Sequence, residues 1–347
     1  MKPSRGQPRA TIADVAERAG VSIATVSRVI NRSAPVAQET ARRVHEAIAA
    51  LHYVPHLAAQ QLASRRTGML GLVVDEISGE FFSPLIRGIE RCAREAGYEL
   101  LIASTGGRGV SVFGEHNTDG ILVFTESLSD EELARLHEAG FPMVLLHRSP
   151  PPGLAIPCVT VENKQGARRM TDHLIEQCGH RRIAFLHGPE GSEDSAWREV
   201  GYRESLAAHK LLYRPELIAA GEFSVHHARL AVEQWITDGL EIDAIFAADD
   251  ESAVGALMAL RSAGIRVPEQ VAVVGFDDLP MVRYLSPPLT TVRAPTERVG
   301  CEAARQLIRL IEQGSAEPLV LLPTELIIRE SCGYGLRHPP ARSTRRR

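Results

Sequence analysis

The sequence predicts an all-α helix-turn-helix head followed by an α/β body with two doubly wound parallel-sheet lobes. Three observations favour this fold. Residues 11–51 carry three short helical patterns, apolar strand-length runs alternate with helical stretches from Met69 onward, and the charge is uneven along the chain. A chain of 347 residues also usually folds as two or three units.

The head has the pattern of two short helices joined by a turn and braced by a third. Thr11 is a candidate N-cap of the first helix, and Gly20 suits its end because glycine adopts positive φ without strain. Ser22 can cap the second helix, and a third begins at about Ala37. Two short helices joined by a turn that contains glycine are typical of a helix-turn-helix.

Positive charge is concentrated in this head. Residues 1–66 contain ten Lys and Arg against four Asp and Glu, a net charge of +6, whereas the remainder carries a net charge of −10. Clustered basic residues favour binding to polyphosphate. We therefore expect the head, and not the body, to contact nucleic acid.

Eight apolar runs in the body are predicted strands. Continuous apolar runs separated by helical stretches indicate parallel sheets that are covered on both faces. Eight such strands divide more naturally into two lobes than into one sheet. The runs are residues 69–75, 98–104, 120–124, 142–147, 158–162, 182–188, 244–249 and 271–277.

Five parts are expected along the chain. They are a disordered arm (1–10), a helix-turn-helix domain (11–54), a hinge helix and linker (55–68), the body (69–333) and a disordered basic tail (334–347). Lobe 1 is expected at about 69–163 and 295–320, and lobe 2 at about 164–294 and 321–333.

Composition and missing motifs argue against several classes of protein. No apolar run approaches the ~20 residues that span a bilayer, and the first twenty residues lack the apolar core of a secretory signal. The five cysteines are scattered without a CxxC pair, which argues against a disulfide framework or a zinc site and favours a reducing cytoplasm. Without a catalytic motif, we expect a cytoplasmic protein that is no enzyme and holds no metal or cofactor.

The stretch TIADVAERAGVSIATVSRVIN resembles the lactose/galactose repressor family of bacterial transcription regulators, as do YVPHLAAQQLAS, LGLVVDEIS, AIFAADDESAVGAL and VAVVGFDDLPMVRYLSPPLTTVRAP. The resemblance covers about residues 11–333. It implies a body similar to periplasmic sugar-binding proteins, a palindromic operator, a homodimer and control by a small sugar-like effector, most simply as a repressor. A solute-binding or sensor protein of the same body fold, without a DNA-binding role, is the alternative.

The second helix of the head is expected to enter the major groove. Arg28 can bind guanine O6 and N7 through two hydrogen bonds, whereas Ile23 and Ala24 offer only apolar contacts, for instance to a thymine methyl. The polar side chains suit phosphate contacts that set the register. The predicted DNA contacts of the head are Ser22, Ile23, Ala24, Thr25, Ser27, Arg28, Asn31 and Tyr53.

The segment HLAAQQLAS is a predicted hinge, too short to persist as a helix alone in water. The resemblance implies that it becomes helical when two copies meet on the operator. Leu62 would then enter the minor groove as a wedge that kinks the duplex, and Ala59 would pack against its twin. Packing of Leu62 on the body is the alternative.

The effector is expected between the lobes. Asp249 and Asp277 follow predicted strands, at the sheet edge where open α/β folds bind ligands. The resemblance adds Arg198, with Phe81, Phe82, Phe223 and His147. Of the adjacent phenylalanines, one is expected in the cleft and the other in the core.

Several alternatives stay open for these residues. Arg198 and Asp277 could form a structural ion pair, and His147 is equally compatible with an interior histidine. A neutral sugar or polyol suits the set, but a sugar acid or phosphate could use the same arginine. The sequence does not say whether the effector releases or enforces DNA binding.

One connection departs from the family pattern. Residues 105–119 hold no helical pattern of 10–12 residues, although the family has a full helix there that flanks the dimer surface of lobe 1. A parallel crossover needs roughly a dozen residues, usually helical. We therefore predict one helical turn or less in this segment.

Overall fold

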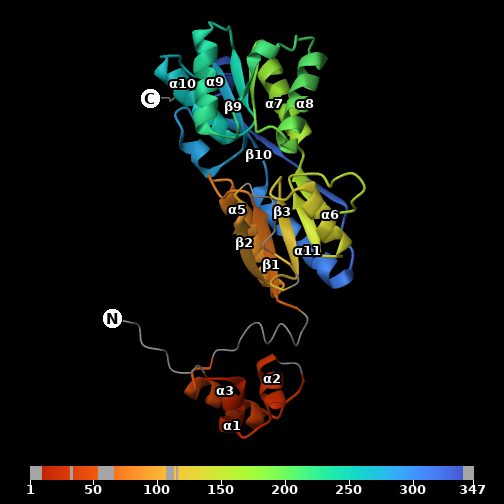
Figure 1. Ribbon diagram of the computed structural model, residues 1–347. Helices are drawn as coiled ribbons and strands as arrows, with labels where there is room; N and C mark the ends of the chain where they lie inside the picture. The colour runs from red at the N-terminus through yellow and green to blue at the C-terminus, as the bar shows by residue number, and fades with distance from the viewer. Residues whose placement is uncertain (1–9, 32–33, 54–65, 107–112, 115, 339–347) are drawn as a thin grey trace, which may run out of the picture. The chain divides into compact units, whose positions relative to one another are not determined.

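The computed structural model describes residues 10–31, 34–53, 66–106, 113–114 and 116–338. The chain divides into two units, residues 1–67 and 68–347. The first holds the helical head and the second the two-lobed body (Figure 1).

The head consists of α1 (Ile12–Ala19), α2 (Ile23–Asn31) and α3 (Gln38–Ala50). Thr11 and Asp14 form a capping box in which the Asp14 amide donates to Thr11 Oγ1 (3.3 Å) and the Thr11 amide donates to Asp14 Oδ2 (2.7 Å). Gly20 ends α1 in the left-handed region with φ of 63°. Ser22 Oγ accepts the Thr25 amide at 3.1 Å, as expected for the cap of α2.

The three helices of the head enclose a small apolar core. α1, α2 and α3 each contribute buried side chains to it, so the amphipathic patterns of the sequence point inward as expected. The buried members are Val15, Ala16, Ala19, Val26, Val29, Val44 and Ala47.

Lobe 1 is a six-stranded, entirely parallel sheet in the order β11-β5-β4-β3-β1-β2. Helices α5 (Phe82–Glu95) and α11 (Thr296–Gln313) pack together on one face, and α6 (Asp130–Glu138) lies on the other. The strands are β1 (Met69–Val74), β2 (Glu99–Ser104), β3 (Gly120–Phe124), β4 (Met143–Leu146), β5 (Cys158–Val161) and β11 (Leu319–Leu322).

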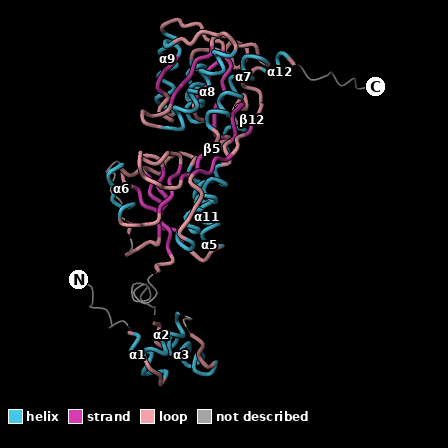
Figure 2. Tube along the Cα trace, turned by 90° about the vertical axis from the view of Figure 1, so that its right-hand side faces the viewer, coloured by secondary structure: helices cyan, strands magenta, loops and turns pink. Residues whose placement is uncertain are grey.

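Lobe 2 repeats this plan with the order β12-β10-β9-β8-β6-β7, in which β12 alone runs antiparallel. Helices cover both faces of the sheet (Figure 2). One face carries α7 (Asn163–Glu176) and α8 (Glu193–Ala208), the other α9 (Val225–Thr237) and α10 (Asp250–Ser262). The strands are β6 (Ile183–His187), β7 (Ile218–Ala220), β8 (Ala244–Ala247), β9 (Ala272–Asp277), β10 (Thr290–Arg293) and β12 (Glu325–Ile327).

The fold class predicted from the sequence is confirmed, and all eight predicted strands are present. The chain crosses between the lobes three times, after β5, β10 and β11. Because β11 stays in the sheet of lobe 1 to Leu322, lobe 2 resumes two residues later than expected. The expected disordered tail is also wrong at its start, since α12 (Tyr334–Arg337) is helical; residues 339–347 lie outside the described part.

A disulfide joins Cys92 on α5 to Cys301 on α11, so the expectation drawn from the cysteine spacing is wrong for this pair. The two residues are 209 positions apart, and only the packing of α5 against α11 brings them together. Cys158, Cys178 and Cys332 are buried free thiols.

The short connection between β2 and β3 contributes a core side chain. Of residues 105–119, the described ones contain no helix; residues 107–112 and 115 lie outside the described part, so the predicted lack of a full helix stays a prediction. Phe113 is 7% exposed and packs on β1 and β3 on the face that carries α6. A Cβ at Gly71 would lie 2.6 Å from its ring, so glycine is required for this close approach.

We predict that Phe113→Ala lowers the free energy of unfolding of the body by about 3–5 kcal/mol, because the truncation leaves a cavity over β1 and β3. Chemical denaturation followed by circular dichroism measures the change. Leu212→Ala, at a side chain that is 80% exposed, is the control and should stay within about 0.5 kcal/mol of the parent. Equal small losses in both variants would show that Phe113 does not cover the sheet.

Candidate functional site

Helix α2 exposes both apolar and charged side chains on the surface of the head. Val26 and Val29 are buried in the head core, whereas Ala24 and Arg28 are exposed and Ile23 is 51% exposed. Within the described part of the chain, Arg28 has no hydrogen-bond or ion-pair partner. An exposed isoleucine beside an unpaired guanidinium suits base contacts more than solvation alone.

Two other arginines of the head, both on α3, are engaged. Arg42 on α3 pairs with Glu39 and Glu46. Arg43 donates to the carbonyl oxygens of Ala19 and Gly20 and so caps the end of α1.

The remaining predicted DNA contacts lie in different settings. Ser22 and Thr25 share a hydroxyl hydrogen bond of 2.9 Å, Ser27 is half-buried, and Tyr53 packs against the head core. The side chain of Asn31 and the hinge residues Ala59 and Leu62 lie outside the described part of the chain.

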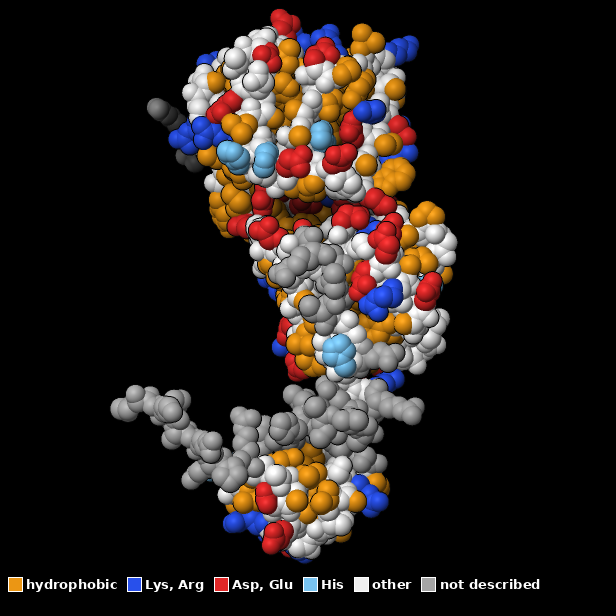
Figure 3. Space-filling view, viewed as in Figure 1, with side chains coloured by type: hydrophobic (Ala, Val, Ile, Leu, Met, Phe, Trp, Pro, Cys, Tyr) orange, Lys and Arg blue, Asp and Glu red, His pale blue; other side chains and the backbone are white. Residues whose placement is uncertain are grey.

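A cavity of about 360 Å³ lies between the two lobes of the body. It is bordered by acidic side chains, which gather in red around the recess (Figure 3). The structure brings all seven predicted effector residues to this one cavity, namely Phe81, Phe82, His147, Arg198, Phe223, Asp249 and Asp277. Prediction missed other members of its lining, among them Asp75, Phe124, Glu126, Glu190, Asp194 and Glu251.

Three phenylalanines form an aromatic wall on the side of lobe 1. The ring centroids of Phe82 and Phe124 lie 5.0 Å apart, and Phe81 lies 5.8 Å from each of them. Phe81 and Phe82 both line the cavity, so the expected division between cleft and core is wrong. Phe124 ends β3, and its place at the end of a predicted apolar run was the signal that could have identified it.

The carboxylate of Asp194 on α8 joins the lobes. Its Oδ2 contacts His147 Nδ1 (2.7 Å). Its Oδ1 accepts hydrogen bonds from Thr160 Oγ1 (3.2 Å) and Asn163 Nδ2 (2.6 Å). Burial alone would raise the pKa of Asp194, but His147, Arg198 and Asn163 outweigh it and hold that pKa below its ordinary value. Asp194 is therefore a largely buried, ionised group in the lining of the cavity.

Arg198, one helical turn after Asp194, is held by groups outside the cavity. Its Nε donates to Asn163 Oδ1 (2.8 Å) and its Nη1 to the Ala248 carbonyl (2.6 Å), while its guanidinium lies 3.8 Å from the centroid of the Phe276 ring. Its Nη2 reaches Asp277 and Asp194 only at 3.5 Å. The arginine is thus fixed, and its long contacts leave it able to bind a ligand oxygen.

Asp249 and Asp277 combine structural and ligand-facing roles. Asp249 caps α10 by accepting the Glu251 and Ser252 amides at 3.1 Å, and burial raises its pKa to about 6. Burial also raises the pKa of Asp277 to about 7, against the opposing effect of Arg198. At neutral pH Asp277 can therefore serve as donor or acceptor.

His147 is buried at 4% exposure, yet its Nε2 has no partner in the described part of the chain. Because Nδ1 is engaged with Asp194, Nε2 is the ring nitrogen that can bond a ligand. His147, Thr125, Phe223 and Asp277 all line the cavity with positive φ (60°, 42°, 49° and 111°). Backbone strain of this kind clusters at binding sites, and the orphan nitrogen indicates that a polar ligand group belongs beside it.

Comparisons with known proteins match both the head and the body of the chain. Residues 11–56 match the family described as bacterial regulatory proteins, lacI family, and residues 171–332 match the periplasmic binding protein-like domain. The chain is 38% identical to the HTH-type transcriptional regulator CelR of Thermobifida fusca over 93% of its length and 98% of the relative. It is 34% identical to the ribose operon repressor of Halalkalibacterium halodurans, with 94% and 98% covered.

Two solved structures share the fold over most of the chain. A CelR–cellobiose complex matches with a TM-score of 0.70 and 36% identity, covering 93% of this chain and all of that one. The Lac repressor dimer bound to operator and an anti-inducer matches with a TM-score of 0.81 and 26% identity, covering 93% and 99%. No helix in the described residues is long and apolar enough to cross a membrane.

We predict that Asp277→Asn reduces the pH dependence of stability. Because the native pKa of about 7 lies above the ordinary value of 3.8, the native state holds the extra proton between these values, and the free energy of unfolding falls as pH rises through this window. The limiting slope for one group is about 1.4 kcal/mol per pH unit. Urea denaturation from pH 4.5 to 8 measures it, with the exposed Asp238→Asn as control. Identical slopes in all three proteins would contradict the shift.

Proposed function

Because the chain belongs to the lacI family of bacterial regulatory proteins, and is a DNA-binding transcription regulator, we propose that it represses its target genes under control of a neutral sugar bound between the lobes. The observation that carries the proposal is the orphaned Nε2 of His147, buried at a cavity whose other walls are carboxylates and aromatic rings. Sugar hydroxyls both donate and accept, and aromatic rings cover the apolar faces of sugar rings.

Charge favours a neutral ligand over a sugar acid or phosphate. Arg198 is the one Lys or Arg among the residues that line the cavity in the described part of the chain, against seven carboxylates. Arg198 is also already close to Asp194 and Asp277. An added anion would meet a surplus of negative charge in a buried site. Since the CelR relative was solved with cellobiose, a β-linked disaccharide is the first ligand to test.

The same contacts suggest how a ligand would act on the DNA-binding head. His147 and Thr160 belong to lobe 1, whereas Asp194 and Arg198 belong to α8 of lobe 2. A sugar bonded to His147 and Arg198 would bias the angle between the lobes. A ligand shifts the equilibrium between two lobe arrangements only if it binds one arrangement with higher affinity than the other.

We further propose that the protein acts in the cytoplasm as a homodimer on a palindromic operator, with Arg28, Ile23 and Ala24 facing the bases. Support comes from the exposed, unpaired Arg28 and from the similarity to the operator-bound Lac repressor dimer. The minor-groove roles of Leu62 and Ala59 stay predictions. A sensor without a DNA-binding role is disfavoured by the complete head.

We predict that Arg28→Ala weakens specific operator binding by ~1–3 kcal/mol and relaxes base preference at one position. Fluorescence anisotropy on a palindromic site with a central CG step, against a scrambled duplex, measures both effects. Arg42→Ala is the matched control and should lose less, because Glu39 and Glu46 already engage that guanidinium. If both variants lost the same affinity, Arg28 would act as a general phosphate contact.

We predict that a neutral sugar changes operator affinity in the parent protein and that His147→Ala loses most of this response. Removing the imidazole removes both the ligand-facing Nε2 and the Asp194 contact. Calorimetry and operator anisotropy with cellobiose, monosaccharides, sugar acids and sugar phosphates measure it, with the exposed His226→Ala as control. A response confined to the charged sugars would overturn the neutral-sugar proposal and leave the DNA-binding function standing.

A further inference from the structure

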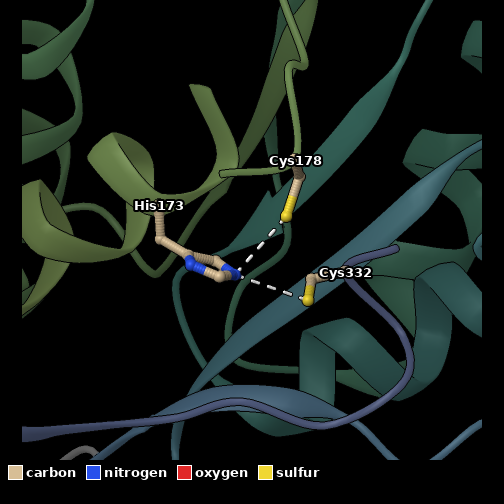
Figure 4. Close-up of side chains that lie close together, drawn as sticks. All are labelled: His173, Cys178 and Cys332. Carbon is tan, nitrogen blue, oxygen red and sulfur yellow. Dashed lines mark hydrogen bonds between the residues drawn. The ribbon is translucent and has the colours of Figure 1, made fainter. Parts of the chain in front are cut away.

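A second cluster of chemically reactive side chains lies in lobe 2. His173 comes from α7, Cys178 from the loop just after it, and Cys332 from the segment between β12 and α12. His173 Nε2 lies 3.4 Å from Cys178 Sγ and 3.5 Å from Cys332 Sγ (Figure 4). All three residues are buried, and their ligand atoms lie within 4.8 Å of one another.

The donor set is that of a thiophilic metal ion. One imidazole nitrogen faces two sulfur atoms, as Figure 4 shows, and thiolates with neutral imidazole are the ligands that zinc prefers. With Zn–S of about 2.3 Å and Zn–N of about 2.0–2.1 Å, a tetrahedral centre has N–S edges of roughly 3.5 Å. The two N–S distances therefore match a shared metal as well as they match hydrogen bonds.

The charge of the donor set favours zinc. Two thiolates balance Zn²⁺, so the filled site would be neutral, which suits its burial. Structural zinc sites have four ligands. His180 is not among the residues whose ligand atoms lie within 4.8 Å of one another, and its Nε2 lies 3.1 Å from the Cys332 carbonyl oxygen, so water would take the fourth position.

We propose that His173, Cys178 and Cys332 bind one zinc ion, with water completing the coordination. The ion would tie the segment after β12 to the end of α7. The site could not be predicted from the sequence, because the two cysteines are 5 and 159 residues from His173 and form no zinc motif with it. Binding to the native state alone would stabilise lobe 2 by mass action.

The test uses the full chain, reduced and freed of metal, titrated with Zn²⁺ against a chromophoric chelator. We expect one tight equivalent in the parent, and a loss of affinity on the order of tenfold or more in Cys178→Ser and Cys332→Ser. Cys158→Ser, a buried free thiol of lobe 1, is the matched control. A Cys92→Ser/Cys301→Ser variant removes the thiols that reduction of the disulfide would expose.

Two further measurements test metal binding without relying on the serine variants. Zn²⁺ should raise the Tm of the parent but not of His173→Gln, and Co²⁺ should give thiolate charge-transfer and tetrahedral bands. Circular dichroism and operator binding without metal report whether each variant is folded. Absence of a tight equivalent, its retention in folded Cys178→Ser, or isolation of a metal-free Cys178–Cys332 disulfide from reducing cells would each overturn the proposal.

Discussion

The ionised carboxylate of Asp194 is the interaction on which the cavity between the lobes depends. It accepts from Thr160 and contacts His147 on one lobe, and it accepts from Asn163 beside Arg198 on the other. A buried carboxylate is stable only when its lone pairs are satisfied, so these contacts fix the groups that face the ligand. The orientation of His147, and hence its unpartnered Nε2, follows from this one anchor.

The fold explains why these groups meet. In each parallel sheet the carboxyl ends of the strands lie at one edge, and the two edges face each other across the cavity. In lobe 1, Phe124 ends β3 and His147 follows β4. In lobe 2, Asp249 follows β8 and Asp277 ends β9. The chain crosses between the lobes three times, and these crossings connect the two sheets.

Much of the fold and part of the site could be predicted from the sequence, because strand periodicity is a local signal. Asp249 and Asp277 could be placed from the apolar runs before them, and the resemblance added Arg198 and His147. Asp194 could not be identified in this way, since it lies in the first turn of a helix among other acids and its role depends on residues 31–47 positions away. Long-range packing likewise determines the Cys92–Cys301 disulfide, which no sequence spacing indicates.

Helix α7 connects the two chemical centres of lobe 2. Asn163, its first residue, holds both Asp194 and Arg198 at the cavity, and His173 near its other end faces Cys178 and Cys332. A helix is stiff along its axis, and α7 packs along α8, which carries Asp194 and Arg198. A bond that restrained the His173 end would thus act on the frame that orients Asn163. The proposed zinc site and the cavity would be coupled if metal binding at one end of α7 and ligand binding at the other stabilised the same packing of α7 against α8.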